Sequence, residues 1–293
     1  MTDSSNINTV KNLKESYGTL SKEEIKNLSI LLSQVFKKKI STSFLNWLYN
    51  DNPNGKAITY NFIDNKKIVA HYALVPITII HNKSYFKAAL SVSIAIHENY
   101  RGLYIFQRMV NKTFELAKSM GIEFVIGVSN KLATPLFVRC FKFKLISPLE
   151  VKIGLGEVLK KNDSSHNFEV FWNNETLSWR LNNPKFKYQI YQNKKKFTVY
   201  NNHYKIFKIE MGNFFEENFQ FLKNNKNKIN YNFNLLNMWI GLDNSSWEKS
   251  FYFNMPNFLK PSPLSFIIKN LNSEKIDIEK KDIKFHLIDF DIF

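Results

Sequence analysis

The stretch from Leu90 to Gly121 places the strongest constraint on how this chain can fold. It begins with an apolar run that ends at Ile96, typical of a buried strand, and continues as a polar turn that contains Arg101 and Gly102. A helical pattern of apolar residues follows and ends at Gly121, a common helix-terminating residue. The first N–H groups of a helix have no partner within it, and the helix dipole favours negative charge there. Strand, basic turn and helix together predict an anion site that suits a pyrophosphate.

The composition is typical of a folded protein in a reducing compartment. The chain has 293 residues, 44% hydrophobic and 15% aromatic, which is enough for one large or two ordinary domains. Its single cysteine, Cys140, excludes an internal disulfide, and no apolar run is long enough to span a bilayer. The polar N-terminus is unlike a signal peptide, so we expect a cytoplasmic protein without a membrane span.

The net charge of +16 at pH 7 has two interpretations. A basic protein suits nucleic acid, an anionic membrane surface or a phosphorylated cofactor. Here, however, the lysines are scattered among many Asn, Ile and Phe residues and form no dense basic block. We therefore favour a solvated lysine-rich surface and expect no nucleic-acid partner.

The first half of the chain predicts an α/β unit that opens with a loose polar segment at 1–19. Ser21 and Glu24 form a capping box that begins a helix. Further helices are predicted at 42–49, 104–120 and 130–140. Strands are predicted at 56–63, 68–80, in the run ending at Ile96, at 123–128, and at 143–153 with an interruption at Pro148.

The second half echoes the first. The segment from Trp47 to Pro53 is answered by the segment from Trp179 to Pro184, and each precedes strand patterns broken by an Asn-Lys-Lys turn. A helix is predicted at 213–224 and a strand at 234–242. The division that follows is a domain at 1–155, a linker at 156–174 and a second domain at 175–293. The echo favours a duplicated fold, and an unrelated α/β domain is the alternative.

The motif at 93–110, SIAIHENYRGLYIFQRMV, resembles the acetyl-CoA motif of the GNAT (Gcn5-related N-acetyltransferase) superfamily, a strand ending in R/Q-G-x-G-x-G/A that opens a helix. It is most similar to a bacterial tandem-GNAT branch, as are EFVIGVSNKLATPLFVRCFKFKLISPLEV downstream and the closing segments LKPSPLSFIIKNL and FHLIDFDIF. The resemblance implies a mixed, mostly antiparallel GNAT sheet flanked by helices, an α/β (α+β) fold, followed by a second, degenerate GNAT-like α/β unit.

The resemblance also implies an acyl-CoA co-substrate, acetyl-CoA or another short acyl-CoA, and assigns residues to it. Ile94, Ala95 and Ile96 would offer strand backbone groups to the thioester and pantetheine arm where a bulge splays the strand from its neighbour. Asn130 would lie near the pantetheine arm. The pyrophosphate would be wrapped by the backbone of Arg101, Gly102, Leu103, Tyr104, Ile105 and Phe106.

Three residues depart from the family pattern. Tyr104 stands where a second glycine is expected, and Lys142 replaces a glycine before Phe143. Phe137 occupies a position where many members have a tyrosine that protonates the leaving thiolate, which a phenyl ring cannot do.

Candidates for a base are few. His97 follows the strand expected to carry the thioester, and its pKa range suits proton transfer, although a cap on the turn is the alternative role. His71 and Tyr72 lie on the adjacent strand, where alternation allows only one of them to face an acceptor cleft, and ordinary packing is the alternative for either.

Other reactive residues predict no further chemistry. Cys140 has no activating partner in the sequence, and no cluster has metal-ligand spacing, so we expect no metal. Asp289 and Asp291 alternate with apolar residues, which predicts the polar face of a final edge strand.

The expected function is that of an N-acyltransferase in which a primary amine attacks the thioester directly in a ternary complex. By analogy with the bacterial branch, the acceptor would be an amino sugar of surface-polysaccharide assembly, free or nucleotide-linked. The alternatives are a FemAB-type aminoacyl transferase and a catalytically degenerate binding or scaffold protein, which Tyr104, Phe137 and Lys142 favour. The oligomeric state is left open.

Overall fold

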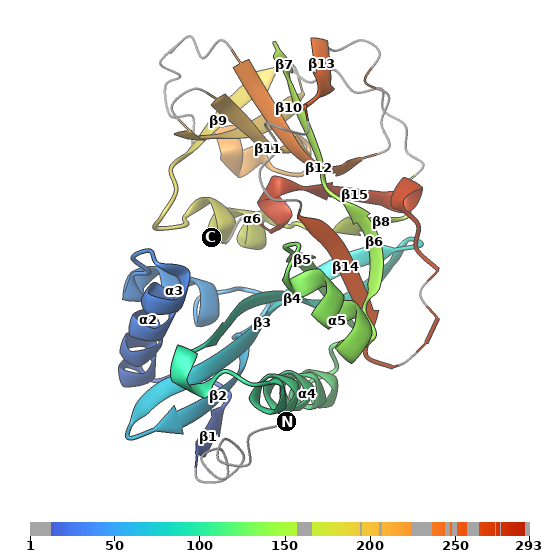
Figure 1. The fold of residues 1–293 in the computed structure, drawn as a ribbon. Coiled ribbons are helices and arrows are strands. Elements are labelled where there is room, and N and C mark those ends of the chain that lie inside the picture. The colour runs from blue at the N-terminus through green and yellow to red at the C-terminus, as the bar shows by residue number, and fades with distance from the viewer. Residues whose placement is uncertain are drawn as a thin grey trace.

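The computed structural model describes residues 13–156, 166–193, 195–204, 207–223, 236–243, 247, 251–256, 264–272, 274–275 and 277–290. Over this part of the chain the predicted mixed α/β fold is confirmed, because a large, mostly antiparallel sheet is flanked by helices (Figure 1). Within the same ranges, no helix is both long enough and apolar enough to cross a membrane.

The helices form where the sequence supplies caps and an apolar face. Ser21 and Glu24 make the predicted capping box that begins the first of them, and Ser41 and Asn173 cap two others with their side chains. The α-helices are α2 (Lys22–Phe36), α3 (Thr42–Tyr49), α4 (Leu103–Ser119), α5 (Ala133–Phe141) and α6 (Asn174–Leu181).

Apart from β1, which was not predicted, the strands of the first half agree with the predicted ranges to within a few residues. They are β1 (Lys14–Tyr17), β2 (Ile58–Asp64), β3 (Lys67–His81), β4 (Ser84–Ile96), β5 (Phe124–Ser129), β6 (Lys144–Pro148) and β7 (Glu150–Leu155). Those that follow are β8 (Phe168–Val170), β9 (Tyr188–Asn193), β10 (Lys196–Tyr204), β11 (Phe207–Phe215), β12 (Leu236–Asp243), β13 (Phe251–Asn254), β14 (Ser265–Asn270) and β15 (Ile283–His286).

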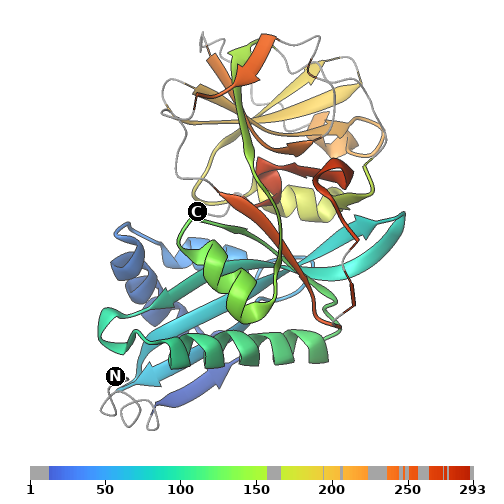
Figure 2. The same ribbon diagram turned by 45° about the vertical axis from the view of Figure 1, so that its right-hand side comes forward.

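The described strands form one continuous hydrogen-bonded sheet, in which two strands pass between the halves of the chain. Strand β14, from near the C-terminus, lies between β5 and β6 of the first half. Strand β7 leaves the first half and lies between β12 and β13. Figure 2 shows the two strands passing between the lower and upper parts of the molecule. The domain boundaries at 155 and 175 therefore stay a prediction. One strand from each side of them, β7 and β14, pairs with strands on the other side.

Alternation along the long strand β3 gives the first half a core on each face of its sheet. Ala73 and Val75 pack with α2 and α3 in one cluster, whereas Tyr72 and Leu74 pack with α4 and α5 in the other. A third cluster fills the second half. The first-half sheet is thus held rigidly between two helical layers, and this fixes the end of β4 relative to α4.

Three local predictions were wrong. The helix predicted at 213–224 is strand β11 as far as Phe215, followed by a 3-10 turn at Gln220–Lys223, because β11 pairs with β10 over this region. The segment 1–19 contains strand β1, which pairs with β2, while residues 1–12 lie outside the described ranges. Asp289 lies buried in a 3-10 turn at Leu287–Asp289 instead of on an edge strand, and Asp291 lies outside the described residues.

Candidate functional site

Strands β4 and β5 form a fork that opens toward the beginning of α4. They run parallel and pair only from Ala88 to Ser91 on β4 and from Phe124 to Gly127 on β5. Beyond these residues β4 continues along β3 to Ile96. The edge of β5 that faced β4 has no further partner among the described strands. The fork therefore leaves backbone groups of both strands available to a ligand.

A bulge lies on β4 just past the fork, as the family resemblance implied. The register with β3 shifts between His71 and Ala73, and Ser93 has a φ of 53°, in the left-handed region that a serine seldom adopts. Ala95 is buried, and Ile94 and Ile96 are half-buried. These three residues still pair with β3 or lie beside it, so their backbone is held in place at the edge of the fork.

Helix α4 begins directly after the turn, and no side chain caps it. Its N-cap residue is Gly102, which forms no side-chain cap hydrogen bond. The side chain of Arg101 is exposed, and its Nε donates to the carbonyl of Ile96 at 3.4 Å, across the turn. The N-terminus of α4 therefore presents unsatisfied N–H groups beside a guanidinium group, which is an arrangement that favours an anion.

Neither the backbone conformation nor the space within the protein requires a glycine at position 102. Its φ of −179° is extended and open to any residue, and a Cβ added there would meet no heavy atom within 4 Å. The missing side chain leaves the helix N-terminus uncovered. A glycine at this point is consistent with a ligand that approaches the backbone closely.

Tyr104, at the position of the family's second glycine, does not cover the helix start with its ring. It belongs to the first turn of α4, and its hydroxyl accepts a hydrogen bond from Nη1 of Arg108 at 3.0 Å, one turn further along. Ile105 is buried beneath the helix, and Phe106 packs against Phe141 with a centroid distance of 5.2 Å.

The other departures from the family pattern also have structural explanations. Lys142 has a φ of 59° as the C-cap of α5, which is the left-handed conformation that explains a glycine in relatives. Phe137 is buried in the aromatic cluster around Phe106 and Phe143. Asn130 caps the start of α5, because its Oδ1 accepts hydrogen bonds from the backbone N–H groups of Leu132 and Ala133.

His97 borders a pocket on the α2 side of the turn. Its Nδ1 accepts a hydrogen bond of 3.4 Å from the backbone N–H of Asn99 and so caps the short 3-10 turn at Glu98–Tyr100. The pocket has a volume of about 460 Å³ and is lined by His97, Asn99 and Tyr100 together with residues of α2 and of the β2–β3 turn. A catalytic role for His97 stays a prediction.

His71 and Tyr72 point to opposite faces of β3, and both are fully buried. The hydroxyl of Tyr72 lies 2.9 Å from Oγ of Ser91. Nε2 of His71 lies 3.0 Å from the hydroxyl of Tyr49, and its Nδ1 lies 2.6 Å from Oδ1 of Asn61. Their polar contacts are internal, and contact with an acceptor stays a prediction for both.

The sequence analysis missed Tyr49 and Asn61. Asn61 is fully buried on β2, and a signal for it was present, because an amide in the centre of the apolar strand ITYNFID requires an internal partner. No local pattern marks Tyr49, which occupies an ordinary apolar position of α3.

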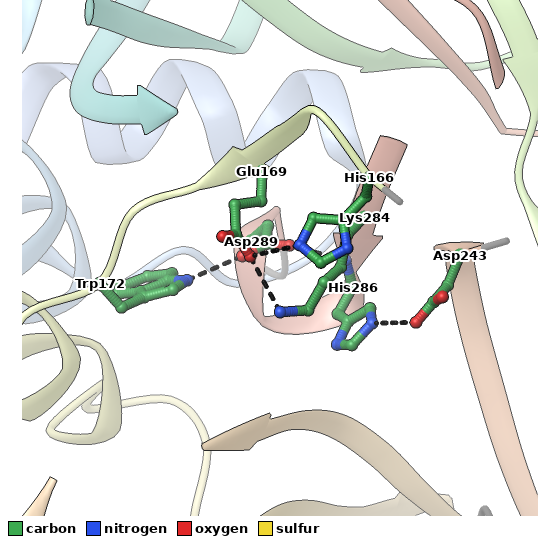
Figure 3. A network of polar contacts seen from close by, with 7 residues as sticks. All are labelled: His166, Glu169, Trp172, Asp243, Lys284, His286 and Asp289. Carbon is green, nitrogen blue, oxygen red and sulfur yellow. Dashed lines mark hydrogen bonds and ion pairs between the residues drawn. The ribbon is translucent and has the colours of Figure 1, made fainter. Parts of the chain in front are cut away.

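A second polar cavity is lined mostly by residues of the other half of the chain, and Figure 3 shows a network of polar contacts that includes several of them. It has a volume of about 390 Å³ and lies between β8, β11 and β15. Glu169 contacts Nζ of Lys284 at 2.8 Å and Nε2 of His166 at 3.5 Å. Burial alone would raise the pKa of Glu169, but these two neighbours lower it to about 2.

Asp289 is the buried carboxyl of this cavity. Its oxygens accept hydrogen bonds from Nε1 of Trp172 at 2.8 Å and from the backbone N–H of His286 at 2.6 Å, as Figure 3 shows for the tryptophan. Burial nevertheless raises the pKa of Asp289 to about 6. Nε2 of His286 lies 3.1 Å from Oδ2 of Asp243. No group of three or more potential metal ligands occurs among the residues that the structure describes.

Comparison with known structures finds similar folds in three solved proteins. A GCN5-related N-acetyltransferase from Kribbella flavida matches with a TM-score of 0.59 and 10% identity over 90% of this chain and 72% of that chain. One from Anabaena variabilis ATCC 29413 matches with a TM-score of 0.58 and 11% identity over 88% and 73%. Saccharomyces cerevisiae N-myristoyltransferase with bound myristoyl-CoA matches with a TM-score of 0.53 and 11% identity over 87% and 79%. At these identities the likeness shows the fold alone.

The sequence comparison identifies the family of the first half. No curated protein matches the chain, but the family model described as "Acetyltransferase (GNAT) domain" matches residues 16–143. These residues contain the fork, the bulge, the turn and α4. The predicted superfamily is thereby confirmed, and the chain carries a GNAT acetyltransferase domain over residues 16–143.

Proposed function

We propose that the chain is an acyl-CoA-dependent N-acyltransferase that moves an acetyl or another short acyl group to a primary amine. The observation that carries the proposal is the uncapped N-terminus of α4, with Arg101 and Gly102 beside it, at the open end of the β4–β5 fork. The pyrophosphate of CoA would bind the N–H groups of the first turn, and the pantetheine arm would lie in the fork. The match to the GNAT domain and the bound myristoyl-CoA of one similar structure support this choice of ligand.

In the proposed reaction the amine attacks the thioester carbonyl carbon directly. A C–N bond forms, the C–S bond breaks, and the amine proton passes by way of solvent to the leaving thiolate. A backbone N–H of β4 near the bulge would donate a hydrogen bond to the carbonyl oxygen as negative charge develops on it. Because Phe137 cannot donate a proton, most of the acceleration would come from positioning of the two substrates.

The second half is proposed to be a degenerate copy of the first. Strands β2, β3, β4 and β5 pair in the same order and directions as β9, β10, β11 and β12, including a parallel last pair. In the second half, however, β15 pairs with Gly241–Asp243 of β12, on the edge that faced β11. Since the chain's own strand fills this second fork, we expect one acyl-CoA per chain.

The acceptor class rests on the resemblance of the sequence to the bacterial tandem branch. We propose an amino sugar, free or nucleotide-linked, as the acceptor of the acyl group. An aminoacyl transferase of the FemAB type is disfavoured, because the Arg101–Gly102 turn fits a CoA pyrophosphate. A scaffold without activity is the remaining alternative, and turnover distinguishes it from an enzyme.

Calorimetric titration with acetyl-CoA tests the proposal. Wild type should bind one acetyl-CoA per chain. Arg101→Ala should bind acetyl-CoA at least about fivefold more weakly, because it loses about 1 kcal/mol of charge-assisted contact. Lys118→Ala, at the other end of α4, is the control and should bind acetyl-CoA like wild type. No heat of binding at millimolar acetyl-CoA would overturn the proposal. Release of free thiol with glucosamine and nucleotide-linked amino sugars then tests catalysis, and binding without turnover for any amine would favour the scaffold.

A further inference from the structure

A chain of polar side chains, four of them buried and two half-buried, connects the bulge of β4 to the surface at α2. It consists of Ser93, Tyr49, His71, Asn61, Ser16 and Glu24. The contacts in order are Tyr49 Oη to His71 Nε2 at 3.0 Å, His71 Nδ1 to Asn61 Oδ1 at 2.6 Å, Asn61 Nδ2 to Ser16 Oγ at 3.3 Å, and Ser16 Oγ to Glu24 Oε1 at 2.9 Å. We call these six residues the polar chain.

The inner end of the polar chain lies at the bulge. Ser93, with its left-handed backbone, is only 7% exposed, and its hydroxyl has no hydrogen-bond partner among the described residues. Burial raises the pKa of the Tyr49 phenol, and the hydroxyl of Ser93 lies close enough to that phenol to lower its pKa in part. A buried hydroxyl without a partner costs free energy, and a ligand at the end of the fork would supply the missing hydrogen bond to Ser93.

The direction of every hydrogen bond in the polar chain follows from Glu24. Burial favours the protonated form of this carboxyl, but hydrogen bonds from Ser21 and Ser16 outweigh it and lower the pKa of Glu24, so it is an ionised acceptor at neutral pH. The hydroxyl of Ser16 therefore donates its hydrogen bond to Glu24, and its oxygen accepts one from the amide NH₂ of Asn61.

The same reasoning fixes the inner half. The amide oxygen of Asn61 then accepts from Nδ1 of His71, so His71 carries its proton on Nδ1 and presents a bare Nε2. Burial lowers the pKa of His71 to about 3, so the ring stays neutral and keeps this tautomer. Tyr49 accordingly donates its proton to Nε2, and its oxygen can only accept on the side of the bulge.

We infer that the polar chain presents a hydrogen-bond acceptor at the β4 bulge, formed by Tyr49 and Ser93, which positions the N–H of the attacking amine. This inference rests on the proposed function and names the residues that hold its second substrate. An amine that donates an N–H to Tyr49 or Ser93 has its lone pair directed away from that bond, toward the thioester at the fork. Tyr49, Ser93 and His71 are thus positioning residues, and no proton is stored on His71.

Kinetics with acetyl-CoA and glucosamine test the inference. Tyr49→Phe and Ser93→Ala should each raise KM for glucosamine, or lower kcat/KM for it, at least tenfold, while the acetyl-CoA affinity stays within twofold of wild type. Tyr60→Phe is the control, because it removes the hydroxyl of another buried tyrosine, one that donates to the carboxylate of Glu15 instead of to a histidine of the polar chain. Unchanged kcat/KM for glucosamine in both test variants would overturn the inference.

A spectroscopic arm keeps the inference separate from the proposed function. Long-range ¹H–¹⁵N spectra of ¹⁵N-histidine protein, assigned by loss of one signal in His71→Gln, should show His71 neutral and protonated on Nδ1 at pH 7. A ring protonated on Nε2 would reverse the polar chain and overturn the inference even if the enzyme is active. Failure of acetyl-CoA to bind, or of any amine to turn over, would instead overturn the proposed function, and the tautomer would still decide the direction of the polar chain.

Discussion

Trp47 and Trp179 exchange hydrogen bonds across the junction of the two halves. Nε1 of Trp47 donates to the backbone carbonyl of Trp179 at 2.9 Å, and Nε1 of Trp179 donates to the backbone carbonyl of Trp47 at 3.0 Å. Their rings stack with a centroid distance of 4.8 Å. The helices that carry them, α3 and α6, are followed by Asn52 and Asn183, each of which accepts from the backbone N–H two residues on. The segments that echo each other in the sequence therefore meet in the structure.

Trp47→Phe and Trp179→Phe should each destabilise the protein by roughly 2–4 kcal/mol, because each change removes buried ring volume and leaves a carbonyl without its donor. In urea unfolding the double variant should lose less than the sum of the single ones, with a coupling of about 0.5–3 kcal/mol. Trp47→Phe combined with Phe114→Leu, on the opposite face of the first-half sheet, is the control and should be additive. Additive losses for the tryptophan pair would show that the reciprocal bonds do not couple the halves.

Gly102→Ala should separate stability from ligand binding. The backbone at Gly102 is extended and the space around a new Cβ is open, so the free energy of unfolding should change by less than about 0.5 kcal/mol. If a pyrophosphate lies against this backbone, the added methyl group displaces it, and the affinity for acetyl-CoA should fall at least about tenfold, or about 1.4 kcal/mol. Calorimetric titration and urea unfolding of the same preparation measure both quantities. Unchanged affinity would place the pyrophosphate elsewhere.

The sequence was sufficient for the features that depend on local pattern. The apolar run before Ile96, the turn at Arg101 and the helix after it were predicted because strand and helix periodicities are local. The exchange of β7 and β14 could not be predicted, since each strand pairs with residues far away in the chain. The polar chain could not be predicted for the same reason, because its hydrogen bonds join residues from separate segments of the sequence.

Residue conformation also lay beyond local pattern. Lys142 adopts a left-handed backbone conformation at a position where the family pattern has a glycine. Ser93 adopts a left-handed conformation within a strand whose sequence pattern predicts regular pairing. The helix predicted at 213–224 failed because strand pairing with β10 outweighed a helical spacing of aromatic residues.

His71 should make the protein sensitive to mild acid. Its pKa is 6.5 in an unfolded chain and about 3 in the buried site, so below pH 6.5 the unfolded state binds the proton and the folded state does not. Stability should therefore fall as the pH drops from about 6.5 toward 3, by up to about 5 kcal/mol. Burial also lowers the pKa of His81, which adds to the loss with the same sign.

The variant His71→Gln isolates this contribution. It should be less stable than wild type at pH 7, because the donor to Asn61 changes, but its stability should fall less between pH 6.5 and 4.5. Urea unfolding at closely spaced pH values measures the two slopes. Identical slopes for wild type and His71→Gln would show that folding does not lower the pKa of His71.

Asp289 should act with the opposite sign over an overlapping range. Its pKa rises from 3.8 to about 6 on folding, so between these values the folded state binds the proton more tightly than the unfolded state. Its contribution to stability is thus largest at low pH and declines by roughly 3 kcal/mol as the pH rises from about 4 to 6. In this range His71 and His81 make the stability of wild type rise with pH, and Asp289 opposes them.

Asp289→Asn should remove the declining part, so its stability should rise more steeply with pH than that of wild type between pH 4 and 6. Glu169→Gln, in the same cavity, is the matched control. The pKa of Glu169 is about 2 in the folded protein, so its contribution is lost only as the pH falls from about 4.5 toward 2, and the slope above pH 5 should match wild type. A slope above pH 5 that changes in Glu169→Gln but not in Asp289→Asn would assign the titration to Glu169. Asp289 would then be ionised throughout this range, as an acceptor of the hydrogen bonds from Trp172 and His286.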